Sequence, residues 1–312
     1  MDPGYAYPLS RRGYARSVSG RRGARAASSL RRLGAAANDN RWVSAVVRAL
    51  LDQVFRRLAG AVGGRLPELI DLEPAALIAE RDPVWLADAG NLERELLPRL
   101  GLSDDLPHVY PAALQHAVGQ GLRHWQYPRQ FAPYLVELSR RSVRSYLEIG
   151  VRHGGTFVIT VEYLSRFGTV ERAVAVDLDH VPALDAYAEE HPEVRPVQVD
   201  SRSRRFARIV RELGPFDLVL VDGNHAYEAV RGDIETVLPH TSMLALHDIV
   251  DDASPGVRRA WAELRAKQGH GFELLEFTAR YDEVLAVIGR PVLGIGLAIR
   301  RSTALQSAAN RT

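Results

Sequence analysis

The chain of 312 residues contains no cysteine, and Lys267 is its single lysine. The absence of cysteine excludes disulfides, thiolate zinc sites and a cysteine nucleophile. No apolar run approaches the roughly 20 residues that a membrane-spanning helix needs, so we expect no membrane span. The Arg-Arg pair at residues 11–12 is not followed by the apolar segment of an export signal, and we therefore expect a cytoplasmic protein.

Basic charge is concentrated at the amino terminus, although the formal net charge of the whole chain is only +2. Residues 1–50 hold ten arginines and two acidic residues, Asp2 and Asp39. A basic arm of this kind can bind nucleic acid or an anionic surface. The use of arginine for almost every cation, together with abundant alanine, indicates codon bias instead. We therefore do not expect nucleic acid as a partner.

Three segments of the chain differ in pattern. Residues 1–40 lack apolar periodicity, which predicts a disordered basic tail. Residues 41–120 predict a helical accessory or cap segment, which begins with an amphipathic helix from Trp42 to Ala61. Further short helices are expected to break at the prolines of this segment, namely Pro67, Pro74, Pro83, Pro98 and Pro107. These helices are a candidate surface for a homo-oligomer, and residues 121–312 are the predicted catalytic domain.

From about Ser145 the chain alternates between short β-rich runs and helical stretches. This alternation predicts an α/β fold with a Rossmann-like, mostly parallel sheet and helices on both faces. The predicted strands are Tyr146–Ile149, Ala173–Val176, Pro196–Val199, Asp217–Val221, Met243–Leu246, Glu273–Phe277 and Leu293–Ile299. The predicted helices cover residues 155–167, 182–190, 203–213, 226–238 and 255–268. The last two strands have no predicted helix between them, so we expect them to pair antiparallel at one edge.

A glycine-rich turn follows the first predicted strand, at the sheet edge where ligands of open parallel sheets bind. Gly150 permits a tight turn, while Gly154 and Gly155 precede Thr156 and open the next helix, where a ligand can approach the backbone. The spacing differs from the G-x-G-x-x-G of nicotinamide-binding proteins. Glu148 precedes the first glycine by two residues and suits an ammonium group, which S-adenosyl-L-methionine (AdoMet) carries.

Carboxylates also follow the second and third predicted strands. Asp177 is placed to accept hydrogen bonds from both hydroxyls of a ribose. The alternative is that Asp177 caps the next helix, a role for which Asp179 competes. Asp200 and Ser201 end the third strand, where a side chain can reach an adenine amino group, although an Asp-Ser pair also commonly caps a helix.

The ends of the fourth and fifth predicted strands carry both carboxylates and imidazoles. Asp222 and His225 follow strand four, and His247 and Asp248 end strand five. Neighbouring strand ends lie about 5 Å apart, so Asp222 and Asp248 can share a divalent cation such as Mg²⁺. His225 is the candidate base that removes a proton from a substrate hydroxyl. Taken singly, each residue has a structural alternative, either as a turn former or as a hydrogen-bonded pocket residue.

Through these motifs the sequence resembles class I AdoMet-dependent methyltransferases. In particular, it resembles the group of cephalosporin hydroxylase-like proteins and macrolide- and aminocoumarin-sugar O-methyltransferases. The resemblance covers residues 120–300 and rests on Glu148-Ile149-Gly150, Gly154-Gly155-Thr156, Asp222-Gly223-Asn224-His225-Ala226-Tyr227, His247-Asp248, Pro255-Gly256-Val257 and Trp125-Gln126-Tyr127-Pro128. It implies a seven-stranded sheet, AdoMet contacts at Glu148, Gly150, Asp177 and Asp200, a metal at Asp222 and Asp248, and a base at His225.

One departure from this group concerns the metal. The metal-dependent sugar methyltransferases usually carry an acid at the position of His247, which leaves metal dependence open. Because histidine can itself bind a metal, the candidate ligands are Asp222, Asp248 and His247. The expected activity is AdoMet-dependent methylation of a hydroxyl on a small molecule or sugar, with Asp222 and His225 as catalytic residues. The alternatives are a nucleotide-binding oxidoreductase, a non-catalytic protein with this fold, and a nucleic-acid methyltransferase that only the basic tail supports.

Overall fold

The computed structural model describes residues 70–301 with the exception of 269–270. The predicted tail at residues 1–40 and the predicted helix from Trp42 to Ala61 lie outside the described residues. The contacts of the chain divide it into two compact units, Met1–Gly63 and Gly64–Thr312, and the described residues belong to the second. In this part of the chain, no helix combines the length and the apolar character that crossing a membrane requires.

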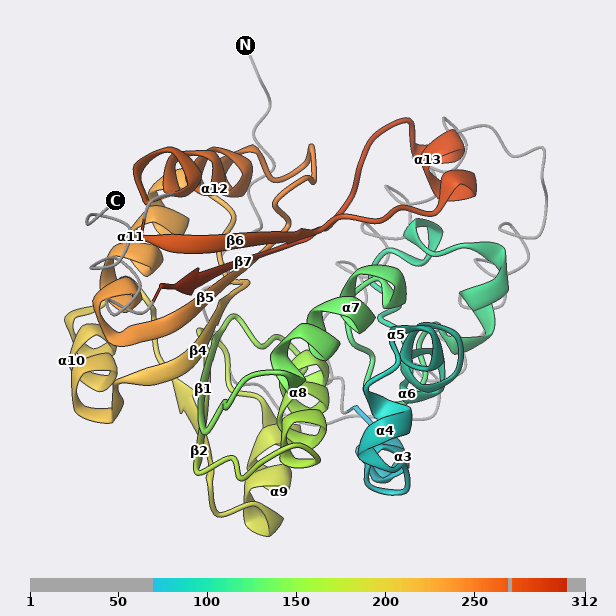
Figure 1. Cartoon of the computed structure of the whole chain (residues 1–312), viewed down its shortest axis with the longest axis horizontal. Coiled ribbons are helices and arrows are strands. Elements are labelled where there is room, and N and C mark those ends of the chain that lie inside the picture. The colour runs from blue at the N-terminus through green and yellow to red at the C-terminus, as the bar shows by residue number, and fades with distance from the viewer. Residues whose placement is uncertain (1–69, 269–270, 302–312) are drawn as a thin grey trace, which may run out of the picture. The chain divides into compact units, whose positions relative to one another are not determined.

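A twisted seven-stranded sheet forms the centre of this unit (Figure 1). Its strands are β1 (Ser145–Ile149), β2 (Arg172–Asp177), β3 (Val194–Gln198), β4 (Phe216–Val221), β5 (Thr241–His247), β6 (Phe272–Phe277) and β7 (Ile295–Arg300). They lie in the order β3-β2-β1-β4-β5-β7-β6, and only β7 runs antiparallel to its neighbours. The predicted Rossmann-like sheet is therefore confirmed. The strand order reverses between β1 and β4, which places a ligand-binding crevice at the carboxyl ends of these two strands.

Alternate residues of each central strand enter two different hydrophobic cores, because side chains alternate across a sheet. Along β1, Tyr146 packs in one core and Leu147 in the other. The first core lies under α7 (Pro128–Ser139), α8 (Gly155–Ser165) and α9 (Pro182–Glu190). The second lies under α10 (Arg204–Leu213), α11 (Tyr227–Val237) and α12 (Pro255–Gln268), and a short 3-10 turn, η5 (Leu238–His240), links α11 to β5. Both faces are thus covered, as predicted (Figure 1).

The connection between β6 and β7 differs from the sequence prediction. The two strands do pair antiparallel, and β6 forms the edge of the sheet. A helix that was not predicted, α13 (Asp282–Ile288), nevertheless lies between them. It packs beyond the end of the sheet, where Val284 joins Val109 and Tyr127 in a separate small core (Figure 1). Seven helical residues are too few to show a clear helical period in the sequence, which explains the omission.

Short helical elements fill the segment before α7. They are η1 (Glu73–Ala75), α3 (Ala76–Ala79), α4 (Pro83–Leu86), α5 (Ala89–Asn91), η2 (Leu92–Leu96), α6 (Leu97–Leu100), η3 (Pro107–Val109) and η4 (Ala112–Ala117). As predicted, helix boundaries fall at Pro74, Pro83 and Pro107, which occupy the first turns of η1, α4 and η3, where no N–H is needed. Pro67 lies outside the described residues. Pro98 lies within a continuous helical run, and η2 just before it is a π-helical turn in which the N–H of Leu97 donates to the carbonyl of Leu92.

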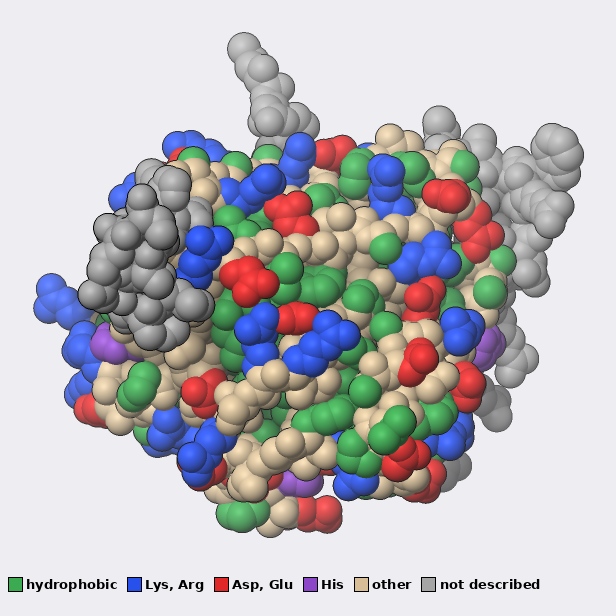
Figure 2. All heavy atoms as spheres, in the orientation of Figure 1, with side chains coloured by type: hydrophobic (Ala, Val, Ile, Leu, Met, Phe, Trp, Pro, Cys, Tyr) green, Lys and Arg blue, Asp and Glu red, His purple; other side chains and the backbone are tan. Residues whose placement is uncertain are grey.

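This segment shares the hydrophobic core of α7 and α8. The hydroxyl of Tyr163 on α8 donates to the carbonyl of Leu86 at 2.9 Å, and the guanidinium of Arg166 donates to the carbonyl of Arg81 at 3.0 Å. The described part of the predicted accessory segment is therefore packed onto the sheet domain. On the face shown in Figure 2, acidic and basic side chains are interspersed.

Candidate active site

The loops after β1, β2 and β4 are joined at the switch point by main-chain hydrogen bonds. The N–H of Gly150 donates to the carbonyl of Val176 at 2.8 Å, and the N–H of Asp222 donates to the carbonyl of Ile149 at 2.8 Å. Gly150 has a φ of +88°, and a Cβ on this residue would lie 2.3 Å from the carbonyl oxygen of Asp222. A glycine is therefore required here for the loops after β1 and β4 to approach each other.

The other two glycines of the turn serve a purpose that the sequence did not indicate. We predicted that Gly154 and Gly155 let a ligand approach the backbone. A Cβ on Gly155 would lie 2.0 Å from the carbonyl oxygen of Leu122, and one on Gly154 would lie 2.7 Å from the side chain of Leu184; the approach of a ligand stays a prediction. In this structure, the two glycines allow the protein's own chain to pack against the start of α8, where Thr156 is buried.

Glu148 lies on β1, directly below the glycine turn, and is 1 % exposed. The hydroxyl of Tyr146 donates to its carboxylate at 2.5 Å. Burial raises the pKa of Glu148 to about 8, although the Tyr146 hydrogen bond and the nearby imidazole of His247 lower it in part. A positively charged group beside this carboxylate would favour its ionised form. The predicted contact with the ammonium of AdoMet is consistent with this environment and stays a prediction.

Asp177 joins two loops at the end of β2. Its oxygens accept hydrogen bonds from the N–H of Arg152 at 2.8 Å and from the N–H of Asp179 at 3.0 Å. Burial raises its pKa, although these hydrogen bonds lower it in part. Asp177 does not cap α9, because the residue at the cap position is Val181. The capping alternative is therefore excluded for Asp177, while its contact with a ribose stays a prediction.

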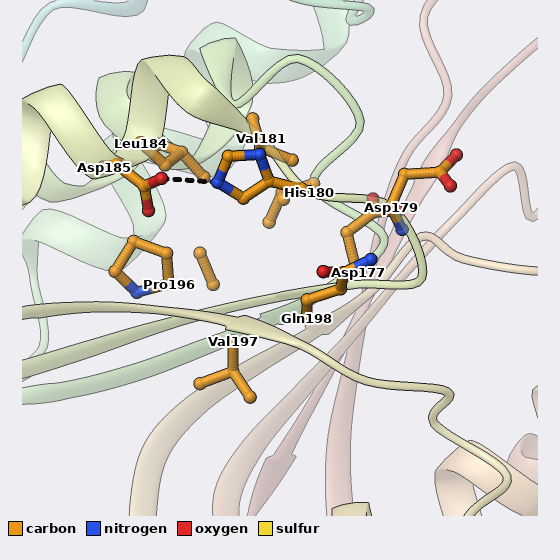
Figure 3. Close-up of a pocket in the computed structure, with 11 residues that line it drawn as sticks. Asp177, Asp179, His180, Val181, Leu184, Asp185, Pro196, Val197 and Gln198 are labelled. Carbon is orange, nitrogen blue, oxygen red and sulfur yellow. Dashed lines mark hydrogen bonds and ion pairs between the residues drawn. The ribbon is translucent and has the colours of Figure 1, made fainter. Parts of the chain in front are cut away.

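A hollow of about 310 Å³ opens beside Asp177, between β2, β3 and α9 (Figure 3). Asp177 and Gln198 line one side of it, and the hydrogen-bonded pair of His180 and Asp185 lines the other (Figure 3). This volume includes open solvent; the space enclosed by the hollow itself is about 60 Å³, well below the roughly 300–1,000 Å³ of small-molecule sites. The lining residues do not include His225 or Asp222.

Asp200 and Ser201 lie beyond the end of β3. Both oxygens of Asp200 accept hydrogen bonds from the guanidinium of Arg202, at 3.0 and 2.9 Å. These hydrogen bonds lower the pKa of Asp200. The cap of α10 is Ser203, which accepts a hydrogen bond from the N–H of Phe206, so Asp200 and Ser201 are not the capping pair. Their predicted contact with adenine is not tested by this arrangement.

Five side chains meet at the carboxyl ends of β4 and β5, and we call them the polar cluster: Asp222, His225, His247, Asp248 and Ser254. His247 Nδ1 lies 3.0 Å from Asp222 Oδ1 and 3.3 Å from Asp248 Oδ1. His225 Nδ1 lies 3.3 Å from Asp248 Oδ2, and its Nε2 lies 3.7 Å from Asp222 Oδ1. Ser254 Oγ lies 3.0 Å from Asp248 Oδ2 and 3.1 Å from His225 Nδ1. The structure thus brings together all four residues that the sequence singled out at these two strand ends.

Burial differs within the cluster. The side chains of His247 and Asp248 are 4 % and 6 % exposed, whereas that of His225 is 27 % exposed. Asp248 adopts a φ of +64°, a left-handed conformation that is uncommon for residues other than glycine. His225 is therefore the member of the pair of imidazoles that a substrate can reach. His247 and Asp248 form the buried part of the cluster, and Asp248 lies 3.3 Å from Nδ1 of His225.

The charges of the polar cluster shift its ionisation. Burial would raise the pKa of Asp222, but the imidazoles of His247 and His225 outweigh it and hold this pKa at about 2. Burial would lower the pKa of His247, but Asp222 and Asp248 outweigh it and raise this pKa to about 9. The pKa of His225 is also raised, because the nearby carboxylates of Asp222 and Asp248 outweigh its burial. Burial raises the pKa of Asp248 despite both imidazoles.

The predicted magnesium site does not match this geometry. Mg²⁺ requires oxygen ligands at about 2.0–2.1 Å in a near-octahedral arrangement. Nδ1 of His247 instead donates to Asp222 Oδ1 at 3.0 Å and lies 3.3 Å from Asp248 Oδ1, a buried oxygen without a hydrogen-bond partner among the described residues. In the described part of the chain, no group of three or more His, Asp or Glu side chains is arranged to hold a metal. The donor set of Asp222, His247 and Asp248 therefore does not fit Mg²⁺ as it stands.

The sequence pattern gave no direct indication of Ser254, which follows Asp248 by six residues and precedes α12. Its position depends on Gly256, because a Cβ there would lie 2.3 Å from the carbonyl oxygen of His225. The Pro255-Gly256 pair, which contributed to the resemblance, was the available signal for this contact. With a glycine at this position, the start of α12 lies against the loop that carries His225.

Arg152 of the glycine turn forms a second contact network with residues that precede α7. The guanidinium of Arg152 lies 2.6 Å from Asp105 Oδ1 and stacks 4.7 Å above the ring of Trp125. Burial would raise the pKa of Asp105, but His153 and Arg152 outweigh it and lower this pKa well below its usual range. Sequence analysis assigned no role to Asp105 or Arg152. The segment from Trp125 to Pro128 contributed to the resemblance, and this contact joins Trp125 to the glycine turn.

Comparison with known proteins gives a matching domain family and a relative. Residues 147–249 match a family described as a methyltransferase domain. Mycinamicin VI 2''-O-methyltransferase of Micromonospora griseorubida is 31% identical over 222 residues, which cover 67% of this chain and 51% of that protein. The chain therefore spans about half the length of this relative.

Two solved structures illustrate the structural similarity. MycE methyltransferase from the mycinamycin biosynthetic pathway, in complex with Mg and SAH, has 22% identity and a TM-score of 0.39, with 58% of this chain and 50% of that chain covered. An O-methyltransferase from Bacillus cereus in complex with SAH has 13% identity and a TM-score of 0.43, with 73% and 91% covered. Similarities this low add nothing to the assignment. The matched domain and the relative confirm the resemblance to class I AdoMet-dependent O-methyltransferases, and residues 147–249 carry a methyltransferase domain.

Proposed function

We propose that this chain is an AdoMet-dependent O-methyltransferase that acts on a hydroxyl of a small molecule or sugar. The observation that carries the proposal is the position of His225 at the switch point. His225 is the accessible imidazole of the polar cluster. In the loop before it, the N–H of Asp222 donates a hydrogen bond to the carbonyl of Ile149 at the end of β1. Asp222, Asp248 and Ser254 contact His225 and orient it. A base at such a place can take the proton of a hydroxyl while that oxygen attacks a methyl group.

AdoMet is proposed to lie across the ends of β1, β2 and β3. In this proposal, Glu148 and the turn from Gly150 to Thr156 hold the methionine part, and Asp177 holds the ribose. Asp200 and Ser201 lie on the side of the adenine. The hollow beside Asp177 supports this direction, because Asp177 and Gln198 line it at the ends of β2 and β3.

The reaction is a direct displacement. The hydroxyl oxygen forms a bond to the methyl carbon as the carbon–sulfur bond breaks, the proton passes to Nε2 of His225, and S-adenosylhomocysteine leaves. Holding donor and acceptor in line supplies much of the rate of such a reaction. Asp222 lies 3.7 Å from Nε2 of His225 and stabilises the imidazolium that forms.

Calorimetric titration with S-adenosylhomocysteine tests the cofactor part of this proposal. We expect dissociation constants in the micromolar range. Transfer of labelled methyl from AdoMet to a panel of glycosides and phenols then tests the acceptor class. A folded protein that binds NAD(P)H in place of S-adenosylhomocysteine would overturn the proposal and support the oxidoreductase alternative. Binding without transfer to any hydroxyl acceptor would favour the non-catalytic alternative.

A further inference from the structure

The polar cluster contains an arrangement that the proposed function does not require, namely an imidazole between two carboxylates. His247 is almost completely buried, and its Nδ1 lies within 3.3 Å of oxygens from both Asp222 and Asp248. Carboxylates accept hydrogen bonds only, so the Nδ1 of His247 carries a hydrogen and donates it. The hydrogen bond itself goes to Asp222, at 3.0 Å.

Buried Asp248 and half-buried Asp222 both approach the same ring nitrogen, and two carboxylates in such a place need a positive partner or donor between them. In a site for Mg²⁺, the cation takes this role and lies about 2.1 Å from each oxygen. In this chain, the ring of His247 takes the place of the cation beside the two carboxylates. The ring is anchored by its position at the end of β5, where it pairs with Ile295 of β7 in the central part of the sheet.

We propose that His247 replaces a divalent cation in this site: its Nδ1–H lies where a metal shared by Asp222 and Asp248 would lie, so the protein binds AdoMet and acceptor without Mg²⁺. The inference deepens the proposed function, but its test measures metal binding and does not depend on methyl transfer. It also makes a positive prediction. Replacing the donor by a third carboxylate leaves three acidic groups around one point, and these would bind a hard cation.

The experiment uses the full chain and Mn²⁺, which substitutes for Mg²⁺ and is followed by electron paramagnetic resonance. The wild-type protein should leave Mn²⁺ free at millimolar concentration. His247→Glu should bind one Mn²⁺ per chain, at least ten times more tightly than the wild type. His116→Glu is the matched control, because it adds the same acid at an exposed position outside the cluster and should not bind.

His247→Asn provides a second variant in case the glutamate prevents folding. Asparagine keeps an N–H donor and should leave the protein folded, without Mn²⁺ binding and with unchanged affinity for S-adenosylhomocysteine. Tight binding of Mn²⁺ or Mg²⁺ by the wild-type protein would overturn the inference. So would binding of a softer metal such as Zn²⁺ that His247→Asn abolishes. The second result would place the metal at Nε2 of His247, a buried atom without a hydrogen-bond partner among the described residues.

Discussion

The two halves of the candidate site are built differently. On the side of β2 and β3, the charged groups are held by nearby main-chain atoms or by a residue two positions away, as in the pair of Asp200 and Arg202. On the side of β4 and β5, five side chains from two strand ends and the start of α12 contact one another. The first half is a set of separate contacts, whereas the second is a connected network.

This difference assigns separate roles to the two halves. Separate, partly exposed contacts are suited to binding a ligand, because each can exchange one hydrogen bond for another. A buried network fixes the orientation of its members, since every displacement leaves a polar group without a partner. We therefore expect substitutions beside β2 and β3 to change cofactor affinity. Substitutions beside β4 and β5 should change the rate of the chemical step.

The largest effect is expected for His225→Ala. General-base catalysis contributes about 10²–10⁴-fold to rates, so kcat should fall by about this factor. Affinity for S-adenosylhomocysteine should stay within twofold, because His225 does not line the hollow beside Asp177. Single-turnover methylation and calorimetry measure the two quantities. An unchanged kcat would exclude His225 from the mechanism. It would also contradict the assignment of binding to the β2 and β3 side and of catalysis to the β4 and β5 side.

Asp177→Asn should give the opposite pattern. Hydrogen bonds to charged groups contribute about 1.5–3 kcal/mol, which corresponds to a roughly 10–100-fold weaker affinity for S-adenosylhomocysteine. At saturating AdoMet, kcat should change little. Glu190→Gln, an exposed change at the end of α9, serves as the control and should alter neither value. If Asp177→Asn lowered kcat without changing affinity, the ribose contact proposed for this residue would be wrong.

The sequence was sufficient to predict what depends on local pattern and on topology. Apolar runs located all seven strands to within two residues, and parallel topology placed Asp222, His225, His247 and Asp248 at one edge. The contacts among these residues could not be predicted, because they depend on side-chain directions at two separate strand ends. Ser254 was missed for the same reason: it lies 29 positions from His225, and only the packing of α12 brings them together.

The glycine turn illustrates a second limit. The sequence predicted the tight turn at Gly150 correctly, since a positive φ there is a local property. It could not predict that Gly155 accommodates the backbone at Leu122, because that contact depends on how the segment before α7 packs. Glycine in a motif indicates a close approach, and only the structure shows which group approaches.

Gly155→Ala tests this interpretation of the turn. The added Cβ would lie 2.0 Å from the carbonyl oxygen of Leu122, and overpacking of this kind costs about 1–3 kcal/mol of unfolding free energy. Gly168→Ala is the matched control, because no atom lies within 4 Å of the Cβ it would add. Urea denaturation should show a loss for the first variant only. Equal stability of the two variants would mean that the segment at Leu122 does not pack against the turn.

The smallest effect is expected for Ser254→Ala, which tests whether the network extends beyond the charged residues. Ser254 Oγ lies between His225 and Asp248, so its loss should allow the imidazole to turn away from the acceptor. We expect kcat to fall by about tenfold, the equivalent of about 1.4 kcal/mol, with KM for AdoMet unchanged. Ser254→Thr keeps the hydroxyl and should restore most of kcat. A purely structural role would instead lower thermal stability and leave kcat of the folded protein intact, in which case His225 would be oriented by Asp222 and Asp248 alone.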